Sequence, residues 1–510
     1  MSARMSSADT AWLHMDRPTN LMVINSVDLF DQPLDWDRVK EITQTRLIDR
    51  YPRFRQRVVE SRLPWQAPRW EDDPDFSLEH HMHHLALPAP GDRAALQELI
   101  GDLMTQPLDR NRPLWHTYMV DGFGAGAAVI HRMHHCIADG IALARVMLSL
   151  TDGQPEAGIA PPATERPRSR PAGLVPGVVD STGRVVAAAG RAGATVVRQT
   201  VNVAVSPRHA VSLAGAVARD GATAARMLLT PADAASAIKS DPRISRRVAW
   251  SPQLPLDEIK RIAHAHDATV NDVLMAALSG ALRHYLQERG GPVREIQAMV
   301  PYNLRPLDRP VPRELGNRFG LVFLPLPVGV SGSYRRLVEV HFRMSEIKQS
   351  REGPVSYALL SATGLAPEPV ERMIVDLFTG KGTAVVTNVP GPTEPVYLAG
   401  TPVRAVLVWA PTSGHIGMSV SVFSYCGEVT VGLMADAKLI PDPDEVVAQF
   451  ERELKALGRL APRGTGRSPR PAGRSQRPAG RSQRGAGRSR RAAVTPQARA
   501  SAVKARPSRA

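Results

Sequence analysis

Cysteine is scarce in this sequence, with two residues, Cys136 and Cys426, among 510. So few thiols make a disulfide framework improbable and fit a reducing compartment, of which the cytosol is the simplest example. Long apolar runs are also missing, because no uninterrupted apolar stretch reaches the roughly 18 residues of a membrane span. The start, MSARMSSADTAWLHMDRP, lacks a charged segment followed by an apolar one. We therefore expect any membrane contact to be peripheral.

Acidic residues are absent from residues 463–510, which hold 14 Arg or Lys side chains. The formal net charge of +15 comes almost entirely from this tail, because residues 1–462 contain 50 basic and 49 acidic residues. The tail also lacks aromatic side chains for base stacking, which leaves only attraction to phosphate groups. Anionic lipid head groups offer the same attraction. A nucleic-acid partner is therefore not favoured.

Composition divides the chain into four parts. Residues 1–153 mix short strand-like and helical runs, and RAALQELIGDLMTQPL has helical spacing. Residues 154–245 begin with a proline-rich connector and continue into Ala- and Val-rich segments, for which a packed crossover helix is favoured over a helix on a lipid surface. Residues 246–458 form a second module. Residues 459–510 contain the repeats PAGRSQR, PAGRSQR and GAGRSRR, which lack aliphatic bulk and are expected to be disordered.

The second module contains the clearest helix of the sequence. Apolar side chains recur at i, i+3, i+4 and i+7 from Val270 to Leu286, and the run ends at Gly290 and Gly291. Strands are indicated by GLVFLPLPV, TAVVTNVP and VRAVLVWA, and SVSVFSYCGEVTVGLMAD predicts a hairpin that turns at Cys426-Gly427. Both modules are therefore α/β.

Three histidines crowd into the segment HRMHHCIADG, residues 131–140. A strand AAVIHRMHH would alternate faces, placing His131 and His135 on one side and His134 on the other. One of the adjacent histidines should then be inward and structural. The other, where strand gives way to loop, can project into a cleft as a neutral imidazole, which is the form that a general base needs.

The other residues of this segment are expected to have structural tasks. Asp139 should brace the turn by an ion pair or backbone hydrogen bonds, and Gly140 should permit a positive φ or a close backbone approach. Cys136 is interpreted as a small packing residue, because a nucleophilic cysteine needs a lowered pKa and a positioned base. A nucleophilic serine is not indicated, because no G-x-S-x-G elbow occurs.

Two further patterns suggest metal or nucleotide binding only weakly. EHHMHH, Glu79–His84, would split its histidines between two strand faces, so solvated or edge-strand histidines are favoured over a zinc site. No metal site is therefore expected. DGFGAGAAV has the wrong glycine spacing for dinucleotide binding and is interpreted as a turn that feeds the motif strand.

The first turn of the long helix carries two polar side chains. Asp272 is expected to form a variant capping box with Thr269. Asn271 lies where free N–H groups and the helix dipole favour negative charge, so it could contact an oxyanion or a bound substrate carbonyl. A structural role for Asn271 stays equally open.

The segment His134–Gly140 has the pattern HHxxxDG, which resembles the signature of CoA-dependent acyltransferases with the chloramphenicol acetyltransferase fold. That superfamily also includes the condensation domains of nonribosomal peptide synthesis. Further landmarks, RPLWHTYMVDG, ATVNDVLMAALSGALRHYL, ELGNRFG and TNVPGP, are similar to those of bacterial wax ester synthase/acyl-CoA:diacylglycerol acyltransferases. The resemblance runs from about Ala8 to about Leu457.

This resemblance implies an α/β fold of two chloramphenicol acetyltransferase-like domains, with mixed sheets flanked by helices and an active-site tunnel at their interface. It implies that His135 removes the proton of an alcohol as the oxygen attacks an acyl-CoA thioester, without an acyl-enzyme. His134, Asp139 and Gly140 would support the motif. Acyl-CoA would be a co-substrate, and no cofactor is implied.

The acceptor implied by the resemblance is diacylglycerol or a long-chain alcohol. An enzyme of this kind is expected in the cytoplasm, in peripheral contact with the inner face of the membrane or with lipid droplets. Two alternatives stay open: a lipid-binding or tethering protein that keeps the fold without catalysis, and a condensation-type acyltransferase. The intact HHxxxDG pattern argues against the first, and the free-standing chain makes the second less attractive.

Overall fold

The computed structural model describes residues 2–61, 66–156, 158, 220–306, 310–366 and 368–460. The proline-rich connector, much of the crossover region and the arginine-rich tail that the sequence predicts lie outside these residues. By its contacts, Met1–Pro462 forms one unit. No helix of the described ranges is long and apolar enough to cross a membrane.

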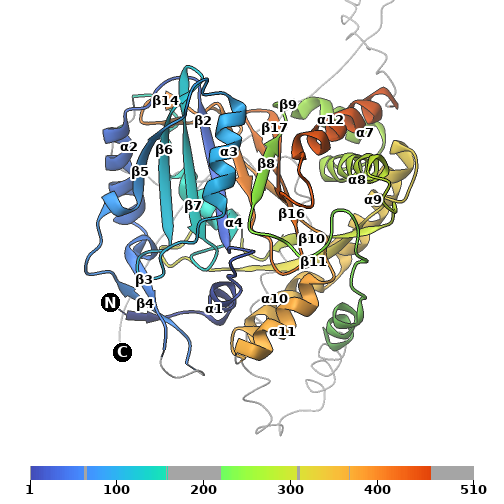
Figure 1. Ribbon diagram of the computed structural model, residues 1–510, viewed down its shortest axis with the longest axis horizontal. Coiled ribbons are helices and arrows are strands. Elements are labelled where there is room, and N and C mark those ends of the chain that lie inside the picture. Colours follow the sequence, from blue (N-terminus) through green and yellow to red (C-terminus); the bar gives the residue numbers. More distant parts are fainter. Residues whose placement is uncertain are drawn as a thin grey trace, which may run out of the picture. The chain divides into compact units, whose positions relative to one another are not determined.

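A five-stranded mixed sheet carries the histidine motif (Figure 1). Its order is β15-β2-β7-β6-β5, in which β5 and β6 run parallel and the other neighbours run antiparallel. The strands are β2 (Val23–Phe30), β5 (Met82–Ala86), β6 (Trp115–Phe123), β7 (Gly126–His134) and β15 (Ala405–Trp409). The central strand β7 is buried along its whole length. The predicted turn into the motif strand is confirmed, with Gly124 at φ 60°.

The second sheet is formed by the later part of the chain. Its order is β11-β10-β12-β16-β17-β8, and β9 also pairs with β17. Its strands are β8 (Arg246–Trp250), β9 (Leu254–Pro255), β10 (Ile296–Asn303), β11 (Phe319–Leu326), β12 (Ala384–Pro390), β16 (Met418–Tyr425) and β17 (Glu428–Asp436). The predicted hairpin is confirmed, because β16 and β17 are joined by Cys426 and Gly427, both at positive φ.

Two small sheets complete the strands. The first has the order β1-β4-β3, and the second pairs β13 with β14. Their bounds are β1 (Ser2–Arg4), β3 (Gln56–Val59), β4 (Arg69–Asp72), β13 (Tyr397–Leu398) and β14 (Thr401–Pro402).

One strand of the first sheet comes from the second module of the sequence. The segment VRAVLVWA, within residues 246–458, forms β15 and pairs with β2 instead of joining the second sheet. Leu407 and Trp409 of β15 are buried in one cluster with Leu96 and Trp250. A shared core therefore joins the two sheets. The position of β15 in the sequence does not by itself determine which sheet the strand joins.

Helices cover both sheets (Figure 1). The long helix predicted from Val270 is confirmed as α8, and it packs against α9, α12 and the second sheet. The predicted helix in RAALQELIGDLMTQPL is confirmed as α3, which packs against β8. The helices are α1 (Ser7–His14), α2 (Trp36–Thr43), α3 (Arg93–Met104), α4 (Gly140–Leu148), α7 (Leu256–Ala265), α8 (Val270–Glu288), α9 (Ser333–Gln349), α10 (Glu352–Thr363), α11 (Glu368–Thr379) and α12 (Pro443–Leu460).

The described part of the crossover region begins with a helix. Residues 220–229 are helical, and Met227 is buried in a cluster with Met299 and Phe323. On its outer side, Leu229 is 81% exposed. Met227 is thus packed, but the choice between a packed crossover helix and a helix on a lipid surface stays a prediction, because most of the predicted crossover residues lie outside the described ranges.

Candidate active site

His135 follows the last residue of β7, in the loop that leads to α4. Its backbone N–H donates to the carbonyl of Met22, at 2.7 Å, which fixes the chain where it leaves the sheet. The imidazole is 5% exposed and stacks on the indole of Trp12, with ring centroids 4.0 Å apart. The ring centroid of Phe319, the first residue of β11, lies 5.4 Å from that of His135. The ring is thus held by side chains from both modules.

The hydrogen bond between His135 and Asn317 determines which imidazole nitrogen is basic. The Asn317 amide nitrogen donates to the carboxylate of Asp9 and to the backbone carbonyl of His135, both at 2.8 Å. Because both partners are acceptors, the amide oxygen must face His135 Nδ1, which lies 2.9 Å away. Nδ1 therefore carries the proton and donates to Asn317. The Nε2 lone pair is left to accept a proton, as a general base requires.

Helix α1 supplies the support behind this pair. Asp9, in its first turn, is 3% exposed and accepts hydrogen bonds from the backbone and side-chain N–H groups of Asn317. The Ser6 hydroxyl donates to the other Asp9 oxygen, at 2.6 Å. Burial raises the pKa of Asp9. Three residues further along, the ring of Trp12 covers His135, so one short helix both holds Asn317 and shields the imidazole.

Burial lowers the pKa of His135 to about 4 from an ordinary value of 6.5. The imidazolium form is disfavoured because the ring is removed from water, and the Asn317 hydrogen bond and the charge of Asp139 offset this only in part. The ring consequently stays neutral as the pH falls below 6.5 and becomes charged only as the pH approaches the folded-state pKa. At neutral pH it is in the form that accepts a proton.

His134 points to the opposite side of the strand and is 2% exposed. Its Nδ1 accepts a hydrogen bond from the backbone N–H of Cys136, at 3.2 Å, so its proton lies on Nε2. Nε2 faces the carboxylate of Asp16 at 3.8 Å. These contacts fold the loop back on the strand end, and none of them joins His134 to His135 through a side-chain hydrogen bond within the described residues.

Asp139 ties the motif loop to the second module. One carboxylate oxygen accepts from the backbone N–H of Ala142, which caps the start of α4. The other accepts from the Arg305 guanidinium at 3.0 Å and from the backbone N–H of Arg318 at 3.1 Å. Arg305 also donates to the carbonyl of Gly316, next to Asn317. The carboxylate therefore holds both loops of the site in place.

The expectation for Gly140 is wrong. Its φ is not positive, because it is the first residue of α4 and has helical backbone geometry. A Cβ added at this position would have no neighbour within 4 Å, so no close backbone approach requires glycine. The turn is instead made by the capping carboxylate of Asp139. The space beside Gly140 belongs to a pocket, which is described below.

The polar side chains at the start of α8 make their described hydrogen bonds to residues other than His135. The predicted capping box is confirmed, with reciprocal hydrogen bonds between Thr269 and Asp272. Asn271 accepts a hydrogen bond from the side chain of Asn388, at the end of β12. No described contact joins Asn271 to His135. Its role toward an oxyanion or a substrate carbonyl stays a prediction.

Cys136 lies in the motif loop and is fully buried. Burial raises the pKa of its thiol well above the usual value, which disfavours the nucleophilic thiolate. The packing interpretation of this residue agrees with the raised pKa.

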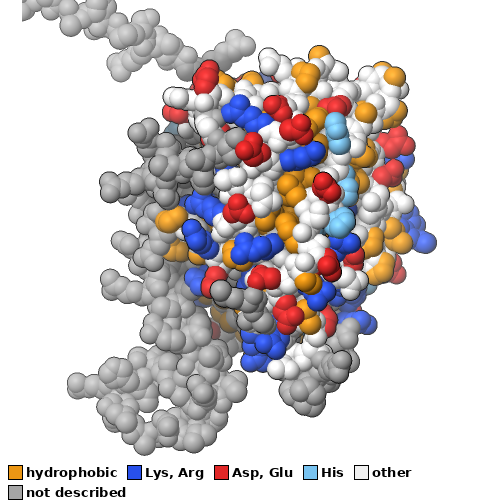
Figure 2. Space-filling view, turned by 90° about the vertical axis from the view of Figure 1, so that its left-hand side faces the viewer, with side chains coloured by type: hydrophobic (Ala, Val, Ile, Leu, Met, Phe, Trp, Pro, Cys, Tyr) orange, Lys and Arg blue, Asp and Glu red, His pale blue; other side chains and the backbone are white. Residues whose placement is uncertain are grey.

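The other histidine-rich segment forms the edge of the first sheet. In β5, His83 contacts His116 and His84 contacts Asp121, so the alternation splits the two neighbours as expected. His81 departs from the expectation, because it is fully buried and its Nδ1 lies 2.8 Å from the carbonyl of Trp115. Among the described residues, no group of three or more His, Cys, Asp or Glu side chains could hold a metal ion. Figure 2, which views the molecule from the left-hand side of Figure 1, shows acidic and basic side chains interspersed on that surface.

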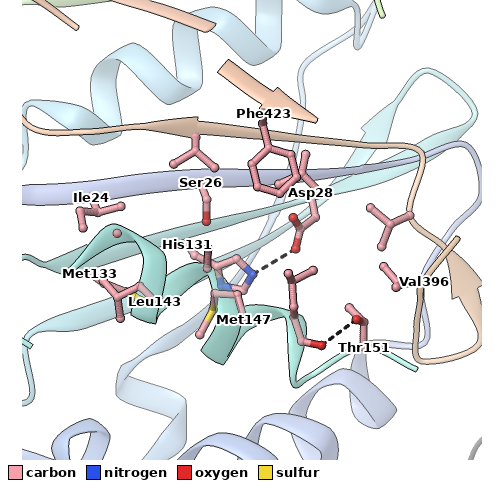
Figure 3. A pocket seen from close by; sticks show the side chains of 16 residues that line it. Ile24, Ser26, Asp28, His131, Met133, Leu143, Met147, Thr151, Val396 and Phe423 are labelled. Atoms are coloured by element: carbon pink, nitrogen blue, oxygen red, sulfur yellow. Dashed lines mark hydrogen bonds and ion pairs between the residues drawn. The ribbon is translucent and has the colours of Figure 1, made fainter. Parts of the chain in front are cut away.

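A pocket lies between α4 and the first sheet (Figure 3). It encloses about 600 Å³, including the part open to solvent. Most of its lining is apolar, and the polar side chains are few. The lining residues include Ile24, Met133, Leu143, Met147, Val396, Val406, Val408 and Phe423, with the polar Ser26, Asp28, His131 and Thr151. Gly140, the first residue of α4, also borders it, whereas His135 is not among the residues that line it.

Comparison with known proteins decides the family. The family model of the wax ester synthase/diacylglycerol acyltransferase catalytic domain matches residues 5–274, and that of the C-terminal domain matches residues 315–458. The chain belongs to the wax ester synthase/diacylglycerol acyltransferase family. A member named as a probable diacylglycerol O-acyltransferase from Mycobacterium tuberculosis is 28% identical over 425 residues, covering 81% of this chain and 86% of that protein.

Solved structures show the same fold. A wax ester synthase/diacylglycerol acyltransferase from Marinobacter aquaeolei VT8 superimposes with a TM-score of 0.63 at 22% identity, covering 90% of this chain and 99% of that one. The starter condensation domain of rhizomide synthetase superimposes with a TM-score of 0.55 at 15% identity, covering 90% and 94%. The mixed α/β, chloramphenicol acetyltransferase-like fold expected from the sequence is therefore confirmed for this family member.

Several residues that the structure brings to the His135 site had no role predicted from the sequence. Asn317, Arg305 and Asp9 all make side-chain hydrogen bonds within or next to the motif. Asn317 lies within the landmark segment ELGNRFG and Asp9 lies at the start of the family resemblance, so a signal for both existed. Nothing in local spacing indicated that these segments meet, because 182 positions separate Asn317 from His135.

We predict that Asp139→Ala destabilises the protein by about 3–5 kcal/mol, because it removes a helix cap and leaves the Arg305 guanidinium buried without its partner. Asp139→Asn should lower the free energy of unfolding by less, since the amide oxygen can still cap α4. Urea unfolding followed by circular dichroism measures both. A loss below about 1 kcal/mol for Asp139→Ala would show that the carboxylate is not the brace.

Proposed function

We propose that this chain is an acyl-CoA-dependent O-acyltransferase that esterifies diacylglycerol to triacylglycerol and long-chain alcohols to wax esters. The observation that carries the proposal is the Asn317–His135 hydrogen bond, which leaves Nε2 of a neutral imidazole as the basic nitrogen. Family membership supports the acyl donor and the class of acceptor. The proposal includes no metal or other resident cofactor.

The reaction then proceeds by direct transfer. His135 Nε2 accepts the proton of the acceptor hydroxyl while the oxygen forms a bond to the thioester carbonyl carbon. The tetrahedral oxyanion collapses, the carbon–sulfur bond breaks, and the CoA thiolate leaves with the electron pair. The imidazolium returns its proton to that thiolate, so the histidine is regenerated. Asn317 stabilises the imidazolium because its amide oxygen accepts from Nδ1 in both states.

The pocket beside Gly140 is suited to an aliphatic chain of one substrate. Ligand pockets are typically lined by apolar side chains with a few placed polar groups, as here. Because Met133 and Gly140, which flank His135 in the sequence, line the pocket, we propose that a chain in it starts close to His135. A tunnel that admits the second substrate from the other side is part of the proposal.

The same proposal includes peripheral contact with a lipid surface through α11. Its outer face exposes Val370, Met373 and Leu377 at i, i+3 and i+7, with exposed fractions of 41%, 66% and 47%. This spacing forms one apolar stripe, as in helices that lie in a lipid interface. On its inner face, α11 contacts α1 through the hydrogen bond between Glu371 and His14. A lipid substrate would thus arrive beside the helix that supports His135.

Palmitoyl-CoA incubated with diacylglycerol or hexadecanol should release CoA only when the acceptor is present. We predict that His135→Ala lowers kcat/KM by about 10² to 10⁴-fold, the usual contribution of a general base. The matched control is His415→Ala, an exposed histidine that pairs with Asp241 away from the motif. Thiol release and chromatography of the lipid products measure the effect. Undiminished turnover in His135→Ala would reject this residue as the base.

The alternatives give other results in that assay. A lipid-binding or tethering protein would bind vesicles without any transfer by the wild type. A condensation-type enzyme would require an amine acceptor on a carrier-bound thioester and would leave both alcohols unreacted.

We predict that Met373→Asp weakens binding to anionic phospholipid vesicles by roughly tenfold or more, because a charge replaces the most exposed side chain of the stripe. Val338→Asp is the matched control, since Val338 is similarly exposed but lies on α9. Vesicle co-sedimentation measures both variants. If Val338→Asp weakens binding and Met373→Asp does not, the contact does not lie on α11.

A further inference from the structure

The apolar pocket contains a carboxylate that no described residue satisfies. Asp28, on β2, has a side chain that is 15% exposed, and its partner is the Nε2 of His131, 3.5 Å from the carboxylate. Charge-assisted hydrogen bonds are shorter, at about 2.7–2.9 Å. No hydrogen bond from any described residue reaches the Asp28 carboxylate. Figure 3 shows the carboxylate and the imidazole facing each other inside the pocket.

The pair is held rigidly, as a binding site requires. His131 is opposite Ser26 in the register of β7 and β2, and Asp28 is two residues further along the same face of β2. The other imidazole nitrogen, Nδ1, lies 3.0 Å from the hydroxyl of Thr117 on β6. That contact orients the ring so that Nε2 points into the pocket toward Asp28. Thr151, another polar lining residue, already donates to the carbonyl of Leu148.

Filling the pocket with a plain hydrocarbon chain would be unfavourable at this point. The chain would displace water from Asp28 and would offer no hydrogen-bond donor in return, and a buried charge without such a partner is costly. A hydroxyl on the chain removes that penalty, because it can donate to the Asp28 carboxylate and accept from His131. The surrounding side chains, such as Met147 and Val406, would contact the rest of the chain.

We infer that Asp28 and His131 recognise a hydroxyl group on the aliphatic chain that occupies this pocket, so that the enzyme favours a hydroxylated chain over a plain one. The inference rests on the proposed function, since it assumes that the pocket holds a substrate chain. Two substrates could bring the same chemistry: a hydroxyacyl-CoA donor, or an acceptor alcohol with a second hydroxyl along its chain. Asp28 and His131 are specificity-determining residues in either case.

The test compares kcat/KM in two arms. In the first, stearoyl-CoA and a series of hydroxystearoyl-CoA isomers are used with hexadecanol. In the second, stearoyl-CoA is used with hexadecanol and with hexadecanediols that carry an internal hydroxyl. We expect at least one hydroxylated chain in one arm to be preferred by about tenfold or more, the factor that one hydrogen bond to a charged group supplies. The arm in which it occurs identifies the substrate.

Asp28→Leu should remove that preference and raise turnover of the plain chain, because the pocket becomes fully apolar. Val406→Leu is the matched control: Val406 lies opposite Asp28 in the register of β15 and β2 and lines the same pocket. It should lower turnover of plain and hydroxylated chains together and keep their ratio. Asp28→Asn, which keeps the shape, replaces Asp28→Leu if circular dichroism shows that the leucine variant does not fold.

Equal kcat/KM for plain and hydroxylated chains in both arms, or a preference that survives in the Asp28 variant, overturns the inference while the proposed function stands. If the wild type transfers no acyl group to any acceptor, the proposed function fails instead. The hydroxyl inference is then decided by thermal unfolding with stearic acid and with hydroxystearic acid isomers. A larger rise in Tm with a hydroxylated acid in the wild type alone supports it, and equal rises overturn it.

Discussion

The orientation of one amide group, that of Asn317, is the constraint on which the site depends. Its nitrogen is committed to two acceptors, the Asp9 carboxylate and the carbonyl of His135, so its oxygen has to face the imidazole. This arrangement protonates Nδ1 and leaves Nε2 basic. Burial under Trp12 keeps the ring neutral, because the pKa of His135 falls to about 4. The strand end therefore presents a neutral imidazole whose Nε2 is the basic nitrogen.

Parts of the chain that are distant in sequence converge on this orientation. Asp9 comes from α1, Asn317 precedes β11, and the Asp139–Arg305 ion pair fixes the two loops that carry His135 and Asn317. The architecture makes this convergence possible, because β15 crosses into the first sheet and one core joins both sheets. Helix α11 is linked to the same network through His14, whose pKa is raised to about 9 by its hydrogen bonds to Glu371 and Glu60. The proposed lipid-contacting face of α11 and the proposed base His135 are therefore both linked to α1.

Local patterns in the sequence predicted local structure well. The helix from Val270, its capping box and the hairpin at Cys426-Gly427 are each determined by neighbouring residues, through apolar spacing, a side-chain cap and positive φ values. The motif strand and the opposite directions of His134 and His135 follow from the two-residue period of a strand. The HHxxxDG pattern located the candidate base because all of its residues belong to one strand end and the loop that follows it.

Such local patterns could not predict features that arise from contacts between residues distant in sequence. The partners of His135 and Asp139 lie in another module, and no spacing rule connects them. The sequence could not assign β15 to the first sheet, because an apolar run does not specify its neighbour. Gly140 was misjudged since the Asp139 cap already makes the turn, and the free space beside the glycine is visible only once the pocket is formed. The polar pair Asp28 and His131 likewise becomes apparent only when β2 and β7 are aligned.

The decisive measurement is the protonation state of His135. In protein labelled with ¹⁵N at histidine, the His135→Gln variant identifies the signals of this ring. The account predicts a neutral imidazole with the proton on Nδ1 at neutral pH, and a protonation midpoint near pH 4, below the ordinary 6.5, since burial disfavours the charged form. A proton on Nε2, or a midpoint at or above 6.5, would contradict it.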